Sequence, residues 1–463
     1  MDSSTSDPRL LREIWHALGG PAHAPEQVAF TGPERGLPSV YAVSSLASAS
    51  IAASLLAIAE LHALRTGRAL PAIQLDRRLA NAAFRSERYL TPIGWKLPPG
   101  WDPIAGDYPT RDGGFIRLHT NYSYHRDAVL AVLEVSATRE AVRSAVATWN
   151  GEELEAAVVA RGGCAALMRS PEAWAAHPQG RAVAAEALAG LRTQDAAPPQ
   201  LPAAAAPLTG VRVLDLTRVI AGPICTRVLA GYGADVLRID PPGFEEVGAL
   251  LPETTAGKRR AQLDLRVPAD RAQFVRLLAD AHVLVHGYRA DALARLGFDA
   301  ARLREHNPNL ISITHDAYGF TGRWAMRRGF DSLVQMSCGI AWRGRAAAGS
   351  PTPLPLPAQA LDHGTGYLLA AATCRALTRL LSSGQASEVR LSLARTAKLL
   401  VDQGDTGDLG APDFSRADAE PWLEAADSAF GPLRRVPCPA GIEGISPNWG
   451  VRAGNLGVDA AAW

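Results

Sequence analysis

Asp362 stands where a carboxylate could do chemistry. It lies in LDHGTG, directly ahead of a segment rich in alanine and leucine that has the composition of a helix. Backbone N–H groups at the start of a helix stabilise negative charge, and Gly364 and Gly366 leave room for a ligand beside the carboxylate. Such a carboxylate can act as a nucleophile. The alternative is a plain N-cap, since aspartate is common ahead of helices and capping contributes about 1 kcal/mol.

Serine, histidine and cysteine side chains are weaker candidates. Ser45 opens a second Ala- and Leu-rich segment, but no GxSxG elbow surrounds it. Three histidines, His282, His286 and His315, fall at the ends of predicted strands, where hydrogen-bonded structural histidines are the more common case. The five cysteines are scattered without metal-ligand spacing, so no metal site is expected.

The segment 208–243 predicts how one part of the chain folds. An apolar strand VRVLDL leads into a turn at Ala221-Gly222-Pro223, a helix over ICTRVLAGYG and a second strand ADVLRID. Strand, turn, helix and strand in about thirty residues form a βαβ unit, which requires a parallel sheet. The turn lacks the GxGxxG dinucleotide fingerprint, which argues against an NAD site. It still presents N–H groups and a helix start, which suit an anionic ligand.

Further strands continue this alternation. They are expected over 261–265, 282–287 and 310–316, with a helix over 269–280. The fold class is therefore α/β, with an open parallel Rossmann-like sheet. Upstream, TRDGGFIRLHT predicts a hairpin, and short helices follow it, so a smaller α+β domain is expected there.

Six ordered motifs carry a resemblance to a known family. They span about 160 residues and are the 208–243 segment, GKRRAQLDL (257–265), VLVHGYRADALARLGF (283–298), NPNLISITHDAYGFTG (307–322), RRGFDSLVQMSCG (327–339) and LDHGTG (361–366). This part of the chain resembles the family III CoA-transferases. That family includes formyl-CoA and carnitine CoA-transferases and the α-methylacyl-CoA racemases.

The resemblance implies roles for two carboxylates. Asp362 matches the nucleophilic aspartate of the family's GD-x-x-TG motif, with Leu361 replacing the usual glycine. Asp331 matches an acidic position that helps to handle the acyl group or the nucleophile. The alternative interpretation of Asp331 is an aspartate at the surface or at a helix cap, without a role in the reaction.

The resemblance also implies contacts to coenzyme A, whose phosphates attract cations. The expected contacts comprise a backbone turn, four basic side chains and one aromatic side chain: Val219, Ile220, Ala221, Lys258, Arg259, Arg295, Arg328 and Tyr288. Each of the four basic residues is alternatively a solvated surface charge. Two positions depart from the family pattern, because Gly287 replaces an asparagine and Pro241 stands where many members have arginine.

The expected function is CoA transfer from an acyl-CoA to a carboxylic acid through an aspartyl anhydride and thioester. Coenzyme A thioester is then a substrate, and no permanently bound cofactor is expected. An acyl-CoA racemase or isomerase of the same family is one alternative. It is disfavoured because Phe330 replaces the racemase histidine and a 1,1-proton transfer needs two acid/base groups. A non-catalytic CoA-binding or scaffold subunit is the other alternative.

The order of parts is unusual for this family. The expected regions are a partial repeat of the aspartate-helix unit (1–85), a small α+β domain (86–193), a Pro/Ala linker (194–207), the Rossmann-like CoA-binding domain (208–400) and a C-terminal return (401–463). The repeat rests on spacing: Ser45 to Gly67 and Asp362 to Gly384 each span 22 positions. The family's small domain ordinarily follows the Rossmann half. The N-terminal part is therefore predicted to close the Asp362 site of a partner subunit in an interlocked homodimer.

The composition of the chain limits the kinds of partner that are expected. Lys and Arg total 47 and Asp and Glu total 46, so no nucleic-acid partner is indicated. The N-terminus lacks a signal-peptide core. The longest apolar run, around 50–63, is predicted to be too short to cross a bilayer, so no membrane partner is expected. Scattered cysteines fit free thiols in a cytoplasmic protein.

Overall fold

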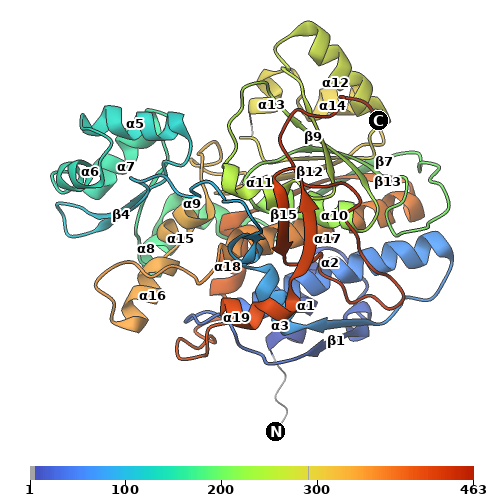
Figure 1. Ribbon diagram of the computed structural model, residues 1–463, viewed down its shortest axis with the longest axis horizontal. Helices are drawn as coiled ribbons and strands as arrows, with labels where there is room; N and C mark the ends of the chain where they lie inside the picture. Colours follow the sequence, from blue (N-terminus) through green and yellow to red (C-terminus); the bar gives the residue numbers. More distant parts are fainter. Residues whose placement is uncertain (1–5, 290) are drawn as a thin grey trace.

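A seven-stranded sheet forms the centre of the computed structural model, which describes residues 6–289 and 291–463 (Figure 1). Its strand order is β10-β9-β8-β11-β12-β13-β7, and only the edge strand β7 runs antiparallel to its neighbour. The strands are β7 (Gly190–Asp195), β8 (Arg212–Leu216), β9 (Asp235–Asp240), β10 (Lys258–Gln262), β11 (Val283–His286), β12 (Ile311–Asp316) and β13 (Gln385–Ser392). The predicted α/β class with an open parallel sheet is confirmed.

Alternate residues of each central strand pack on opposite faces of this sheet. Val213 of β8 joins the core under α10 (Ala221–Gly231) and α17 (Ala360–Ser383). Its neighbour Leu214 packs on the other face, in the core formed with α12 (Pro268–Asp280). Both faces are covered, which explains the continuous apolar runs of these strands.

One strand lies three residues earlier than predicted. The structure places β10 at Lys258–Gln262 instead of 261–265. Its charged residues hide the strand in the sequence, because Lys258 is buried through an ion pair with Asp215 and Arg260 bonds to the Arg452 carbonyl.

Two long helices pack against each other below the sheet. These are α17 and α2 (Val43–Thr66), both 24 residues long and each closed by a glycine in the left-handed conformation, Gly384 and Gly67. Ser45 is the third residue of α2 and Asp362 is the third residue of α17. Each helix is followed by a strand and a helix, which are β2 (Ile73–Asp76) with α3 (Arg77–Ala83), and the longer β13 with α18 (Leu393–Val401). The spacing noted in the sequence thus corresponds to matching local structure.

Among the described residues, α2 alone has the length and apolar composition to cross a membrane, so the prediction that its apolar run is too short is wrong. In this fold 94% of its apolar window is buried. The packing partners of α2 include α17, α3 and α1 (Ser6–Ala17).

A separate lobe with its own core lies to one side of the sheet (Figure 1). Its sheet is β4 (Gly106–Pro109), β5 (Phe115–Leu118) and β6 (Ala165–Leu167), and its helices are α5 (Ser123–Leu133), α6 (Arg139–Val146) and α7 (Gly151–Ala160). β4 and β5 form the predicted hairpin. Chain segment 196–207, within the predicted linker, has no helix or strand, whereas the preceding residues 194 and 195 belong to β7.

The two ends of the chain are interleaved. β3 (Thr91–Pro92) pairs with β15 (Gly431–Arg435), which also pairs with β14 (Glu424–Ser428). β1 (Val28–Thr31) pairs with β2.

The remaining α-helices are α4 (Ser86–Tyr89), α8 (Pro171–Ala176), α9 (Pro178–Ala185), α11 (Leu251–Thr254), α13 (Ala292–Arg295), α14 (Ala300–His306), α15 (Asp331–Ser337), α16 (Ile340–Ala348) and α19 (Arg416–Ala419).

Candidate active site

The two predicted carboxylates meet where α15 and α17 begin. Asp331 opens α15, and its Oδ2 accepts hydrogen bonds from the backbone N–H groups of Leu361 (2.8 Å) and Asp362 (2.9 Å). Gln335 donates to its other oxygen. Because α17 already begins at Ala360, Asp362 is inside the first turn and does not cap the helix. The N-cap alternative for Asp362 is therefore wrong, and Asp331 occupies the N–H groups that a cap would satisfy.

Burial of this pair raises the pKa of both carboxyl groups. Desolvation is the largest cause for Asp362, whose pKa lies well above its ordinary value, and the nearby charges of Asp331 and Glu87 raise it further. Desolvation also raises the pKa of Asp331, although its three donors oppose that shift. The donors favour charge on Asp331, so Asp362 is the carboxyl of the coupled pair that retains a proton more readily.

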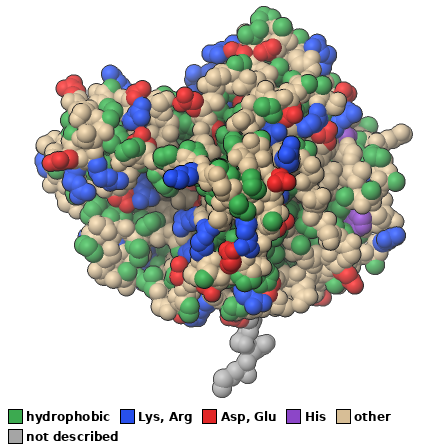
Figure 2. Space-filling model, in the orientation of Figure 1, with side chains coloured by type: hydrophobic (Ala, Val, Ile, Leu, Met, Phe, Trp, Pro, Cys, Tyr) green, Lys and Arg blue, Asp and Glu red, His purple; other side chains and the backbone are tan. Residues whose placement is uncertain are grey.

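Asp362 lines a cavity of about 290 Å³ at the carboxyl ends of the parallel strands β8, β11 and β12. We call it the arginine cavity. Its lining includes four arginines, two aspartates and several aromatic side chains: Arg218, Arg289, Arg327, Arg328, Asp316, Asp362, Tyr122, Tyr124, Phe244, Tyr288 and Phe330. This edge of an open α/β sheet is the usual place for a ligand. Figure 2 shows the molecule hollowed between the lobe of α5–α7 and the part carrying α12–α14, the two regions that supply Tyr124 and Tyr288.

The predicted turn 219–221 lies beside Asp362. Val219 has a positive φ of 64°, which is rare for a β-branched residue, and its N–H is held by Glu246 (3.3 Å). Val219 and Ala221 line the arginine cavity together with Asp362. α17 approaches this turn closely at Gly366, where a Cβ would lie 2.6 Å from the Ala221 carbonyl oxygen. The structure thus brings the turn and the carboxylate together.

Arg218 is a cavity residue that the motif comparison missed. Its guanidinium lies 3.6 Å from the ring centroid of Phe244 and 5.0 Å from that of Tyr288. It also donates to the Tyr288 hydroxyl (3.1 Å). Arg218 directly precedes the VIAG turn. That position could have identified it, because side chains next to a turn that faces a ligand lie close to the same ligand.

Two more of the predicted contacts, Tyr288 and Arg328, also line the arginine cavity. Arg328 donates to the Gly162 carbonyl (2.6 Å), which ties the α5–α7 lobe to this cavity. Ile220 caps α10 and lines a neighbouring cavity described below.

Three predicted basic contacts lie elsewhere. Lys258 is fully buried and bonds to Asp215 (2.9 Å) and the Pro223 carbonyl (3.1 Å), so it supports the start of α10 instead of reaching a ligand. Arg259 pairs with Asp235, and Arg295 is an exposed residue that pairs with Asp291. None of these three side chains lines the arginine cavity, so the structure does not bring them to Asp362 as predicted.

His315 explains the unusual Gly287. A Cβ at position 287 would lie 2.3 Å from Nε2 of His315, whose ring therefore occupies the space of a larger residue 287. Both residues line the arginine cavity. Burial lowers the pKa of His315 to about 4, so its ring is neutral near pH 7. By contrast His282 and His286 are hydrogen-bonded to Arg212 N and Thr314, as expected for structural histidines.

A second cavity, of about 330 Å³, meets the first at Asp362. We call it the tryptophan cavity. Its lining includes Trp101, His119 and Glu87 from the N-terminal half, and Asp331 and Asp362 from the C-terminal half. Both halves come from one chain, so the predicted crossover between subunits is not needed to close the Asp362 site.

Phe330 separates the two cavities, since it lines both. The ring of His119 stacks on Phe330 at a centroid distance of 3.7 Å. Burial lowers the pKa of His119 to about 3. Glu87 in turn pairs with His363 of α17 (Oε2 to Nε2, 3.0 Å). The N-terminal half thus contributes a neutral imidazole and a buried carboxylate beside Asp362.

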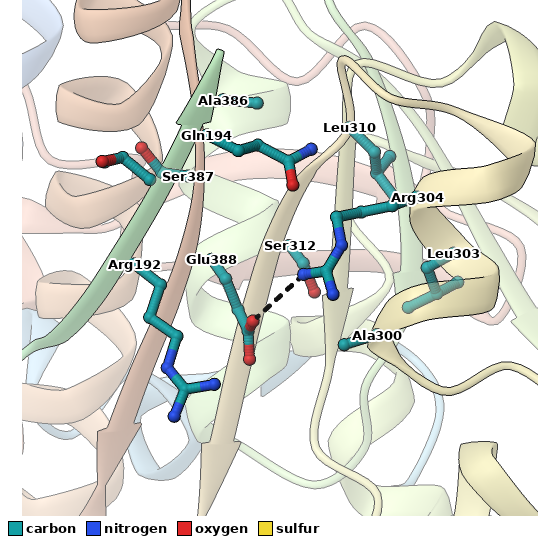
Figure 3. Close-up of a pocket in the computed structure, with 11 residues that line it drawn as sticks. Arg192, Gln194, Ala300, Leu303, Arg304, Leu310, Ser312, Ala386, Ser387 and Glu388 are labelled. Atoms are coloured by element: carbon teal, nitrogen blue, oxygen red, sulfur yellow. Dashed lines mark ion pairs between the residues drawn. The ribbon is translucent and has the colours of Figure 1, made fainter. Parts of the chain in front are cut away.

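A smaller cavity lies far from these carboxylates. It is formed by β7, β12, β13 and α14 and contains the Arg304–Glu388 ion pair, 3.9 Å long (Figure 3). Its volume of about 50 Å³ is far too small for a nucleotide.

The fold and the site define an α/β protein with a buried aspartate where a cationic and a largely apolar cavity meet, at the carboxyl edge of a parallel sheet. Residues 208–416 match the sequence model of CoA-transferase family III. The match covers the part of the chain that carries the six motifs, so the resemblance predicted from them is confirmed for these residues.

Curated relatives agree with this assignment. A probable fatty acyl-CoA transferase of Mycobacterium tuberculosis is 32% identical over 206 residues, covering 41% of this chain and 51% of that protein. The succinate–glutarate CoA-transferase of Agrobacterium fabrum is 30% identical over 237 residues, covering 46% and 58%. The formyl-CoA:oxalate CoA-transferase of Bradyrhizobium diazoefficiens is 31% identical over 198 residues, covering 40% and 46%. The chain spans about half the length of these relatives.

The solved structure of the Mycobacterium tuberculosis protein, in its orthorhombic crystal form, matches at 31% identity. It covers 43% of this chain and 59% of that chain, with a TM-score of 0.40.

Proposed function

We propose that this protein is an enzyme that transfers CoA from an acyl-CoA to a carboxylic acid, with Asp362 as the covalent nucleophile. The observation that carries the proposal is the position of Asp362 at the junction of two cavities, one cationic and one largely apolar. An acyl-CoA is divided in the same way, because its anionic nucleotide lies at one end and its acyl group at the other.

The reaction proceeds by four acyl transfers. The Asp362 carboxylate attacks the thioester carbonyl carbon, the C–S bond breaks, and CoA thiolate leaves an acyl-aspartyl anhydride. The thiolate then attacks the aspartyl carbonyl, which releases the first carboxylate and forms an aspartyl-CoA thioester. The acceptor carboxylate displaces CoA thiolate to give a second anhydride. Attack of the thiolate on the acceptor carbonyl forms the new acyl-CoA and regenerates Asp362.

The arginine cavity is the proposed CoA site. Arg218, Arg289 and Arg328 offer guanidinium groups to its phosphates. The Val219–Ala221 turn and the start of α10 add backbone N–H groups near the same place. Asp331 positions the nucleophile, because it fixes the first turn of α17 through two backbone hydrogen bonds.

A racemase or isomerase is less well supported. His119 and Asp362 both line the tryptophan cavity, so two titratable groups are present. However, the lowered pKa of His119 makes its neutral ring a weak base, and the ring lies flat on Phe330. We expect no deuterium from D2O at the α-carbon of a 2-methylacyl-CoA. Rapid exchange there would favour the racemase.

The proposed setting is the cytoplasm, where the five buried free cysteines would stay reduced. A homodimer, with neither nucleic acid nor membrane as a partner, is part of the same proposal.

Intact-mass analysis tests the nucleophile. The protein is incubated with a panel of acyl-CoA donors and trapped with hydroxylamine. We expect a covalent adduct at Asp362, and we expect Asp362→Ala to abolish both the adduct and CoA transfer while the protein stays folded. The matched control is Ser45→Ala, which changes the equivalent position of α2 and should alter activity little. Full activity of Asp362→Ala would remove this residue from the mechanism, and an unreactive native protein would favour the scaffold alternative.

A further inference from the structure

The tryptophan cavity differs sharply from the arginine cavity in the groups that face it. Most of its exposed wall is apolar, and the apolar residues include Leu97, Trp101, Ile220, Val247, Leu250 and Phe330. Among the described residues that line it, Arg88 is the only arginine or lysine. The arginine cavity has four arginines. The two cavities are therefore suited to different ends of a substrate.

Acidic side chains outnumber basic ones in the tryptophan cavity. Three carboxyl groups line it, those of Glu87, Asp331 and Asp362. The one cation, Arg88, is committed: it lies 3.4 Å from Glu87 and donates to the Pro357 carbonyl (2.8 Å). The described lining therefore offers no cation except Arg88, which is already shared with Glu87 and the Pro357 carbonyl.

Four neutral polar side chains also line the cavity, those of Asn121, His119, Gln359 and Ser332. The Asn121 amide donates to the Gly100 carbonyl (3.2 Å) and accepts from the Asp102 N–H (3.0 Å). His119 is stacked on Phe330. Within the described part of the chain, the buried Ser332 hydroxyl lacks a hydrogen-bond partner, so it is free to donate to one carbonyl or carboxylate oxygen next to Asp331.

We propose that the tryptophan cavity binds the acyl group, and in turn the acceptor acid, and that it selects uncharged apolar acyl groups over those carrying a second carboxylate. This inference rests on the proposed function. A second carboxylate would leave water for an apolar wall, near three other carboxyl groups and with no cation except the already paired Arg88. The reacting carboxylate of the acceptor escapes this cost, because it lies at Asp362 beside the Ser332 hydroxyl and the arginine cavity.

Two donors of equal carbon number test the selection directly. Butanoyl-CoA and succinyl-CoA both carry a four-carbon acyl group, and succinyl-CoA adds a terminal carboxylate. We expect kcat/KM for the native protein to be at least about ten-fold higher with butanoyl-CoA, which corresponds to about 1.4 kcal/mol. Equal use of the two donors, or a preference for succinyl-CoA, would overturn the inference.

A cation placed in the cavity should shift the preference. Val247→Arg puts a guanidinium in the wall, and we expect it to lower the butanoyl/succinyl ratio at least five-fold. The matched control is Val267→Arg, at an exposed position 44% accessible and outside both cavities, which should leave the ratio unchanged. An unchanged ratio in a folded Val247→Arg protein would contradict the assignment of this cavity to the acyl group.

Hydroxylamine trapping distinguishes a failure of the proposed transferase mechanism from a failure of the acyl-group selection. If no acyl-CoA labels Asp362, the proposed transferase mechanism fails and this inference fails with it. If labelling occurs and succinyl-CoA labels as fast as butanoyl-CoA, the mechanism stands and the selection alone is wrong. The native donor comparison decides this even if Val247→Arg does not fold.

Discussion

At the scale of single residues, Asp331 acts on Asp362 in two ways. It orders the first turn of α17 by accepting two backbone hydrogen bonds, and its charge raises the pKa of the neighbouring carboxyl. A nucleophilic carboxylate must be ionised, so activity should increase with pH as Asp362 loses its proton. In the proposed mechanism, the residue that positions the nucleophile therefore also moves the pH range in which Asp362 is ionised upward.

Asp331→Asn should separate these two effects. The amide oxygen keeps an acceptor for the backbone N–H groups, whereas the negative charge is removed. The pKa of Asp362 then falls, and the rising limb of the pH profile of kcat/KM should move to lower pH. Asp331→Ala removes the acceptor too, so it should cost about ten-fold or more in activity at every pH. An unshifted limb in Asp331→Asn would mean that the charge of Asp331 does not control the nucleophile.

Gly287 and His315 should behave as a coupled pair. Gly287→Asn drives a side chain into the His315 ring and should lower CoA affinity and the Tm. His315→Gly makes room, so the double variant should recover much of both losses. A double-mutant cycle by calorimetry and thermal unfolding measures the coupling, which should exceed about 0.5 kcal/mol. Additive losses would show that the two side chains do not share this space.

At the scale of helices and strands, the site depends on how closely α17 approaches α10. Gly366 permits this contact, because a Cβ there would lie within 3 Å of the Ala221 carbonyl and of Ile224. Gly366→Ala should push the start of α17 away from the turn and lower both kcat and the Tm. Gly364→Ala is the control on the same helix, since its nearest contacts are side-chain atoms of Leu46 and Thr396 at 3.3–3.4 Å. Equal effects of the two substitutions would argue against a role for the α10–α17 contact.

The sheet was predictable because its strands are apolar on both faces and alternate with helices. β8, β9, β11 and β12 all lie close to their predicted positions. β10 was misplaced because its buried charges are compensated by partners distant in sequence, such as Asp215 for Lys258.

The candidate site was predictable only where the residues sit in contiguous motifs. Asp331, Asp362 and the turn at 219–221 are of this kind, and the structure brings them together. The tryptophan cavity was not foreseen, because Glu87, Trp101 and His119 come from loops and a short helix more than 200 residues away from Asp362 in the chain. Their contribution follows from tertiary packing, for which the local sequence holds no pattern.

At the scale of the whole molecule, the two halves of the chain complete each other. α2 packs along α17, and β7 from the first half pairs with β13 of the second. The Arg375–Glu60 ion pair joins the two long helices. A single chain therefore holds all the parts of the Asp362 site described above, and a homodimer remains a prediction that does not require exchange of segments.

Cutting the chain within residues 200–206 tests this interdependence. Fragments 1–203 and 204–463, expressed alone, should aggregate or lack cooperative unfolding, because each exposes the apolar face of a long helix. Expressed together, they should co-elute in size-exclusion chromatography and recover transferase activity. Light scattering on the uncut chain reports its oligomeric state in the same experiment. A fragment that unfolds cooperatively by itself would show that one half is an independent domain.

The pairing of β7 with β13 also has a consequence for biosynthesis. The edge strand β7 leaves the ribosome almost 200 residues before the strand it pairs with, and α2 precedes α17 by about 300 residues. The side of α2 that packs on α17 therefore stays exposed until residues 360–383 have been synthesised. Contacts so distant in sequence slow folding and expose aggregation-prone surface. The yield of active protein should then depend on chaperone capacity and translation speed more strongly than for a chain of equal length whose halves fold one after the other.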